Sequence, residues 1–131
     1  MGPGPATLVL LVDDYPDNRD IYVQFLTYAG LRVEEAENGQ QALDKAFALR
    51  PDVIVMDLSL PGLDGWEATR RLKQDPRTRD IPVIALTGHA LAGHSKVAFD
   101  AGCDAYLAKP FTPDAMARVI ATTLGRERVS S

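Results

Sequence analysis

Four stretches that read as buried strands are each followed at once by polar residues that could do chemistry. The stretches are 8–12, 53–56, 83–86 and 104–108, and the residues that follow them are Asp13 with Asp14, Asp57, Thr87 and Lys109. Carboxylates gathered in one place repel one another, so such a cluster persists with a compensating cation. Hard oxygen ligands favour Mg²⁺, which keeps waters and leaves room for a phosphate oxygen. Together with an ammonium and a hydroxyl, such a site would suit a transferring phosphoryl group.

The elements that must position these residues alternate between strand and helix five times. Strands are predicted at 8–12, 31–36, 53–56, 83–86 and 104–108, and helices at 15–29, 38–50, 64–74, 92–101 and 112–125. This alternation predicts an α/β three-layer sandwich, a (βα)5 unit whose parallel sheet is covered on both faces. The second strand alternates in polarity and reads as a partly exposed edge, which favours the strand order 2-1-3-4-5.

Caps and helix breakers predict where the helices begin and end. Asn38 with Gln41 resembles a capping box, and Asp64 with Glu67 repeats the signal. Thr112 is placed as an N-cap before Pro113, while Gly30, Gly102 and Gly125 are placed to end three helices. Gly93 lowers the helix propensity of 92–101, so this helix is expected to be the least firmly seated. The apolar stripes expected to be buried are Ile21, Tyr22, Phe25, Leu26 and Ala29; Ala42, Leu43, Ala46 and Phe47; and Met116, Val119, Ile120 and Leu124.

Length and composition exclude several classes of protein. A chain of 131 residues is expected to form one domain, here 7–125, with short flexible ends at 1–6 and 126–131. The net charge of -4 and the lack of a basic stripe argue against direct nucleic-acid binding. One cysteine, Cys103, cannot form an internal disulfide and fits a reducing compartment. Without a signal peptide or an apolar run near the ~20 residues of a membrane span, a cytoplasmic location away from membranes is expected.

The strand-end residues and their neighbours resemble the receiver domain of bacterial two-component systems, in the CheY-like superfamily. The resemblance runs from Thr7 to Leu124 and implies the flavodoxin-like fold in the predicted strand order. The segments at 85–90 and 101–106 also resemble stand-alone regulators and the receivers of hybrid histidine kinases. The matching residues are the Asp13-Asp14 pair, Asp57, the Leu60-Pro61-Gly62-Leu63-Asp64-Gly65 loop, Thr87 and Lys109-Pro110.

The resemblance implies a role for each residue of the acid cluster. Asp57 would be the phosphoacceptor, a nucleophile that forms an acyl phosphate. Asp14, Asp57 and the backbone carbonyl of Ser59 would bind Mg²⁺, and Asp13 would hold a metal-bound water. Lys109 would pair with Asp57 at rest and with a phosphoryl oxygen afterwards.

A second group of residues would report the modification. Thr87 would donate its hydroxyl to the phosphoryl group, and Tyr106 would turn into the space that Thr87 leaves. Backbone amides of Ser59 and Gly88 would complete the oxyanion cradle. Ser59 and His89 would border the phosphoryl group and influence the access of water.

The resemblance also implies partners. The phosphoryl donor would be a histidine kinase or a histidine phosphotransfer protein, and a downstream protein effector would read the switched face. The chain would be a monomer or a phosphorylation-dependent dimer. It would act as a signalling switch that catalyses its own phosphoryl transfer and slow autodephosphorylation, without being a turnover enzyme.

Simpler interpretations of the same residues are also open. Asp13 and Asp14 could simply cap the first helix. A flavodoxin would need a phosphate loop where two aspartates stand, and the haloacid-dehalogenase motif does not match Asp13-Asp14-Tyr15. The serious alternative is a docking module of the same fold that is not phosphorylated. Cys103 is expected to be a small buried residue, and Trp66 to pack on its neighbours.

Overall fold

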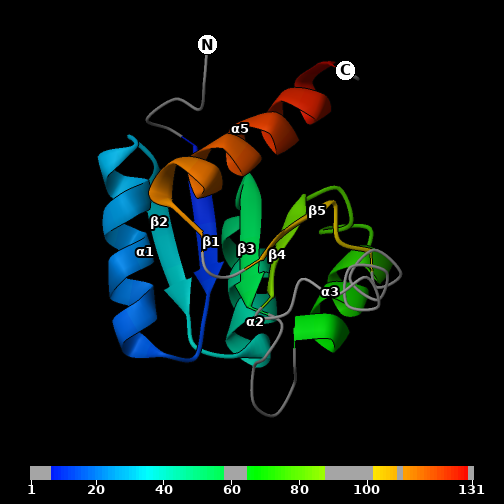
Figure 1. The fold of residues 1–131 in the computed structure, drawn as a ribbon. Coiled ribbons are helices and arrows are strands. Elements are labelled where there is room, and N and C mark those ends of the chain that lie inside the picture. The colour runs from blue at the N-terminus through cyan, green and yellow to red at the C-terminus, as the bar shows by residue number, and fades with distance from the viewer. Residues whose placement is uncertain (1–6, 58–64, 88–101, 109–110, 130–131) are drawn as a thin grey trace.

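The computed structural model has one sheet of five parallel strands with helices on both faces (Figure 1). The structure describes residues 7–57, 65–87, 102–108 and 111–129, without the side chains of 87, 108 and 126–129. The strands are β1 (Leu8–Val12), β2 (Arg32–Ala36), β3 (Val53–Asp57), β4 (Val83–Thr87) and β5 (Ala105–Ala108). The described helices are α1 (Pro16–Tyr28), α2 (Gly39–Leu49), α3 (Gly65–Gln74) and α5 (Pro113–Val129). The sheet order is β2-β1-β3-β4-β5, which confirms the predicted order.

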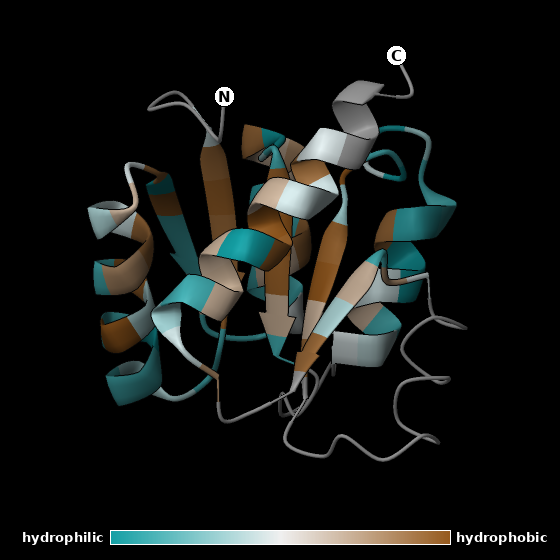
Figure 2. Cartoon of the chain, turned by 45° about the horizontal axis from the view of Figure 1, so that its top comes forward, coloured by the Kyte–Doolittle hydropathy of each residue, from teal (hydrophilic) through white to brown (hydrophobic). Residues whose placement is uncertain are grey.

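The central strands are apolar on both sides because each side faces a pair of helices. Val9 and Leu11 pack with residues of α1 and α5, whereas Leu10 and Val12 pack with residues of α2 and α3. Alternate residues of a strand point to opposite faces, so five successive apolar residues serve two cores. Figure 2 shows the result, with hydrophobic central strands and helices whose segments alternate between hydrophobic and hydrophilic. The edge strand β2 keeps exposed residues, as predicted.

Several predicted helix boundaries are confirmed by hydrogen bonds. The Gln41 amide donates to Asn38 Oδ1 at 2.8 Å, and the side chain of Gln41 accepts from the Glu37 amide at 2.9 Å. The Ala115 amide donates to Thr112 Oγ1 at 3.1 Å, and α5 begins at Pro113. Gly30 and Gly102 have φ values of 89° and 106°, the left-handed backbone that favours glycine. Asp64 and the helix predicted over 92–101 lie outside the described residues.

Two predictions about helices are wrong. Gly125 does not end the last helix, because α5 continues to Val129. A glycine inside a helix costs only about 1 kcal/mol relative to alanine, and no proline follows to force an end. On α1, Ile21 is 46% exposed and Ala29 is also exposed, while Leu26 is buried. Successive helix residues are rotated by about 100°, so Ile21 lies on the flank beside Tyr22 and misses the core.

Among the described helices, none combines the length and the apolar character that a membrane span requires.

Candidate functional site

The carboxyl ends of the strands meet at one edge of the sheet, the lower edge in Figure 1. β3 ends at Asp57, β4 at Thr87 and β5 at Ala108, directly before Lys109. Val12 pairs in register with Met56, so the next residue of each strand places Asp13 level with Asp57. The backbone of Thr87 pairs with Ala108 in the same way. The predicted convergence of the strand ends is therefore confirmed for the backbone.

Three carboxylates form a cluster at this edge. Ligand oxygens of Asp13, Asp14 and Asp57 all lie within 4.8 Å of one another. Asp13 is fully buried and Asp57 is 4% exposed, whereas Asp14 is exposed. Burial and mutual repulsion both raise the free energy of the charged state, and a divalent cation offsets both. The donor set consists of hard oxygen atoms and one carboxylate is open to solvent, which fits Mg²⁺ with part of its water shell.

The cluster is not a helix cap. The N-cap of α1 is Tyr15, and its helix end has no side-chain capping bond. Asp13 Oδ1 instead accepts from the Tyr15 amide at 2.9 Å, the bond of an Asx turn. The Asp13 amide donates to the Ala36 carbonyl at 3.1 Å. The reading of Asp13 and Asp14 as simple caps is therefore wrong, and Asp13 shapes the turn that leads out of β1.

Arg19 is a neighbour of the cluster that the sequence analysis missed. Its Nη1 donates to the backbone carbonyl of Asp13 at 2.9 Å, and its side chain is only 11% exposed. Nε lies 3.3 Å from Glu35 Oε1 and Nη2 lies 3.5 Å from Glu37 Oε1. Glu35 and Glu37 reach Arg19 only because α1 packs beside β2, so local spacing carries no signal for these two contacts. The one available hint was an arginine on the first turn after a pair of aspartates.

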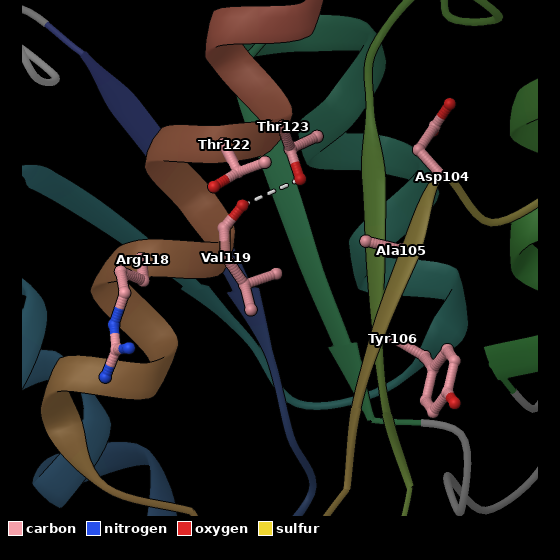
Figure 3. A pocket seen from close by; sticks show the side chains of 7 residues that line it. All are labelled: Asp104, Ala105, Tyr106, Arg118, Val119, Thr122 and Thr123. Atoms are coloured by element: carbon pink, nitrogen blue, oxygen red, sulfur yellow. Dashed lines mark hydrogen bonds between the residues drawn. The ribbon is translucent and has the colours of Figure 1, made fainter.

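Several predicted site residues lie outside the described part of the chain. They are Ser59, Gly88, His89 and Lys109, together with the side chain of Thr87. Tyr106 is described; it is 38% exposed and its backbone pairs with Ala85. A groove of about 350 Å³ runs between β5 and α5, and Tyr106 lines it together with Arg118 and Thr122. Figure 3 shows the Tyr106 ring pointing away from α5, and the groove contains none of the three carboxylates.

Two residues that could invite a chemical reading are structural. Cys103 is 5% exposed, and burial raises the pKa of its thiol to about 11, so the thiol is neutral near pH 7. Trp66 is partly buried and packs against the core under α2 and α3. Both observations confirm the expectations for these residues.

Comparisons with known proteins agree with this arrangement. The model of the response regulator receiver domain matches residues 9–121. The polar-differentiation response regulator DivK of Brucella anthropi is 37% identical over 117 residues, which cover 89% of this chain and 95% of DivK. Response regulator Rre1 of Synechocystis is 34% identical over 94% of this chain, but the chain spans only 54% of Rre1. The chain thus covers nearly all of one relative and about half of the other.

This chain is also similar in structure to a solved receiver domain. The receiver domain of a Pseudomonas aeruginosa sensor histidine kinase, with magnesium in its active site cleft, aligns with a TM-score of 0.86 and 38% identity. The alignment covers 92% of this chain and 98% of that one. The strand order and the family match lead to one conclusion: this chain belongs to the response regulator receiver domain family of two-component systems.

Proposed function

We propose that residues 7–125 form a phosphoacceptor unit in which Asp57 takes a phosphoryl group with the help of Mg²⁺. The observation that carries the proposal is the cluster of Asp13, Asp14 and Asp57, with ligand oxygens within 4.8 Å of one another and two of the three residues buried. Buried carboxylates this close need a compensating cation. The magnesium ion in the similar Pseudomonas receiver domain supports the same choice of metal.

In this proposal, Asp14, Asp57 and the backbone carbonyl of Ser59 hold the ion, and Asp13 holds one of its waters. When bound, Mg²⁺ neutralises the carboxylates and the charge that develops on the phosphoryl oxygens. The fixed Asp13 backbone and the exposed Asp14 carboxylate suit these two roles. A buried residue held by its neighbours can orient a water, and an exposed residue can meet an ion that arrives from solvent.

The chemical step belongs to Asp57. A carboxylate oxygen attacks the phosphorus of a phosphohistidine, the phosphorus–nitrogen bond breaks, and the imidazole leaves with the electron pair. Lys109 and the amides of Ser59 and Gly88 stabilise the phosphoryl oxygens, while Ser59 and His89 control the approach of water. Slow autodephosphorylation follows when water attacks the same phosphorus. The chain is thus a switch with its own phosphoryl-transfer chemistry.

The donor is a histidine kinase or a histidine phosphotransfer protein, and a cytoplasmic protein effector reads the outcome. Phosphorylation draws Thr87 toward the phosphoryl oxygens, because a charge-assisted hydrogen bond is about twice as strong as a neutral one. Tyr106, now 38% exposed, fills the space behind Thr87. The surface of 92–101, β5 and α5 changes with it, and the groove beside Tyr106 lies on this surface.

Beryllofluoride with Mg²⁺ mimics the acyl phosphate and tests this switch by amide chemical shifts. The expected result is a shift that extends from the Asp57 loop through 94–108. Thr87→Ala should break this coupling and still allow phosphorylation of Asp57. Shifts that stay confined to the loops around Asp57 would show that the switch is wrongly assigned.

Phosphate incorporation tests the function itself. The wild-type chain, incubated with acetyl phosphate and Mg²⁺, should gain the mass of one phosphate. Asp57→Asn keeps the shape of the side chain and removes the nucleophile, so it should gain nothing. Absence of incorporation in the wild type, with Mg²⁺ present, would favour the docking module that is not phosphorylated. Incorporation into Asp57→Asn would show that another residue is the acceptor.

A further inference from the structure

We propose that Arg19 is a positioning residue that sets the direction in which Asp14 enters the cation site. This inference rests on the proposed function, because it concerns the same carboxylates. It assigns a role to a residue of α1 whose side chain is almost buried, at 11% exposed, although it is charged. A charged group in that position requires partners, and the partners indicate what it does.

The contact that matters is the bond from Arg19 Nη1 to the Asp13 carbonyl at 2.9 Å. That carbonyl belongs to the peptide group that joins Asp13 to Asp14. The peptide group is planar, so fixing its oxygen also fixes the Asp14 amide and the line to the Asp14 Cα. Arg19 therefore holds the base of the Asp14 side chain without touching its carboxylate.

The peptide groups before and after this one are also held by hydrogen bonds. The Asp13 amide donates to the Ala36 carbonyl at 3.1 Å, and Asp13 Oδ1 accepts from the Tyr15 amide at 2.9 Å. Together with Arg19, these bonds fix Asp13 before and after its Cα. Asp14 is exposed, so packing does little to fix its position. Its direction depends on the peptide that Arg19 holds.

Two glutamates in turn hold Arg19. Nε lies 3.3 Å from Glu35 Oε1, and Nη2 lies 3.5 Å from Glu37 Oε1. The Lys45 ammonium donates to the Glu35 carbonyl, and the Glu37 amide donates to Gln41 Oε1 at 2.9 Å. The guanidinium thus reaches two carboxylates and one carbonyl from a planar group. A lysine ammonium is a compact point charge and cannot reproduce this fork.

Charge and position predict opposite effects at this residue. A positive charge beside a cation site repels Mg²⁺, so charge alone predicts that loss of Arg19 strengthens binding. Positioning predicts that its loss weakens binding, because Asp14 then samples other directions. Arg19→Lys keeps the charge and removes the fork, and therefore isolates the positional effect. Arg19→Gln removes both the charge and the fork, so the sign of its effect shows which of the two dominates.

The test is the Mg²⁺ dissociation constant, measured by isothermal titration calorimetry on folded protein without a phosphoryl donor. Loss of a residue that orients a metal ligand weakens metal binding by roughly 10- to 100-fold, and Arg19→Lys is expected near the lower end. Arg19→Gln should also bind more weakly than wild type. The matched control is Arg71→Lys, because Arg71 is 52% exposed and pairs with Glu67 on α3, away from the acid cluster. It should bind Mg²⁺ like wild type.

A second readout separates positioning from damage to the nucleophile. The phosphorylation rate of Arg19→Lys with acetyl phosphate should fall at low Mg²⁺ and recover when Mg²⁺ saturates the site. Unchanged affinity in Arg19→Lys, or tighter binding in Arg19→Gln, would overturn the assignment. If Arg19→Lys does not fold, Glu37→Gln gives the test, since it removes one exposed anchor and should weaken binding by less. Failure of the wild type to bind Mg²⁺ would instead count against the proposed function.

Discussion

The two ends of the sheet differ in which charged side chains they bring together: a carboxylate and an ammonium at the amino end, and three carboxylates at the carboxyl end. At the amino end, Asp104 Oδ2 lies 2.9 Å from Lys73 Nζ and accepts from the Val83 amide at 2.8 Å. Lys73 also donates to the Ile81 carbonyl at 2.8 Å, so one ammonium links α3 to the starts of β4 and β5. At the carboxyl end, Asp13, Asp14 and Asp57 gather carboxylates of the same sign.

In the proposed function, the amino end contributes to stability and the carboxyl end binds the cation. The carboxylate of Asp104 meets an ammonium and an amide within the described chain, so it requires no ligand. The carboxyl-end cluster brings three like charges together at the edge where open α/β sheets bind ligands, and the proposed function assigns an external cation to it. Substitutions at the amino end should therefore alter the free energy of unfolding and leave Mg²⁺ binding intact. Substitutions at the carboxyl end should alter the response to Mg²⁺.

The largest expected effect is the response to Mg²⁺. An ion at a hundred times its dissociation constant stabilises the folded chain by about 2.7 kcal/mol, and this should appear as a rise in Tm of several degrees. Asp14→Ala should lose the rise, and without Mg²⁺ it should be no less stable than wild type because a repelling charge is gone. Asp20→Ala, an exposed aspartate of α1, is the control and should keep the rise. A wild-type Tm that ignores Mg²⁺ would show that the cluster is misread.

Lys73→Met tests the amino end. The methionine keeps part of the apolar stem, but Asp104 loses its ammonium and the Ile81 carbonyl loses a donor. Asp104 keeps the Val83 amide, and loss of the two Lys73 bonds should lower the free energy of unfolding by about 2 kcal/mol, as measured by urea denaturation. The increase in Tm caused by Mg²⁺ should remain. Loss of that increase would show that the two ends are coupled and that the division proposed here is wrong.

Substitutions at two glycines should change the stability in opposite directions. Gly102 has φ of 106°, and an added Cβ would lie 2.8 Å from Lys73 Cγ, so Gly102→Ala should destabilise the chain by about 1–3 kcal/mol. Gly125 lies inside α5 with nothing within 4 Å of an added Cβ, so Gly125→Ala should stabilise it by about 0.5–1 kcal/mol. Thermal unfolding of both variants measures the pair. If both variants changed the stability in the same direction, the backbone conformation assigned to one of the two glycines would be in error.

The smallest effect near neutral pH is the contribution of the Cys103 thiol to the pH dependence of the free energy of unfolding. Burial holds the pKa of the folded thiol at about 11 against the ordinary 9.0, so the unfolded chain releases this proton first as the pH rises. The contribution to stability is complete below pH 9 and is lost as the pH approaches 11. The difference in unfolding free energy between wild type and Cys103→Ala should therefore be flat below pH 9 and should fall above it. A flat difference up to pH 11 would contradict the raised pKa.

Much of the fold was predictable because its signals are local. Apolar strands, the Asn38 cap and the left-handed glycines Gly30 and Gly102 each depend on a few neighbouring residues. Gly125 was misjudged because ending a helix at glycine also needs contacts after the helix, and a lone glycine only weakens the helix. Ile21 was misjudged because sequence periodicity does not fix where a buried stripe ends.

Part of the candidate site could also be predicted from the sequence, and part of it could not. The meeting of Asp13, Asp14 and Asp57 follows from strand order, which periodicity predicts. The role of Arg19 does not, because its partner Glu35 lies 16 positions away on another element and only the packed structure joins them. The meeting of the three carboxylates can thus be predicted from sequence, whereas the contacts of Arg19 with Glu35 and Glu37 require the fold.

The most direct test of the central claim is to trap the phosphorylated residue. Borohydride reduces an acyl phosphate to an alcohol, so an aspartyl phosphate becomes homoserine and phosphate is released. The chain is treated with acetyl phosphate and Mg²⁺, reduced, digested and sequenced by mass spectrometry. The account predicts homoserine at position 57, with Asp13, Asp14 and Asp104 unchanged. Homoserine at position 13 or 14, or at the amino-end residue 104, would contradict it.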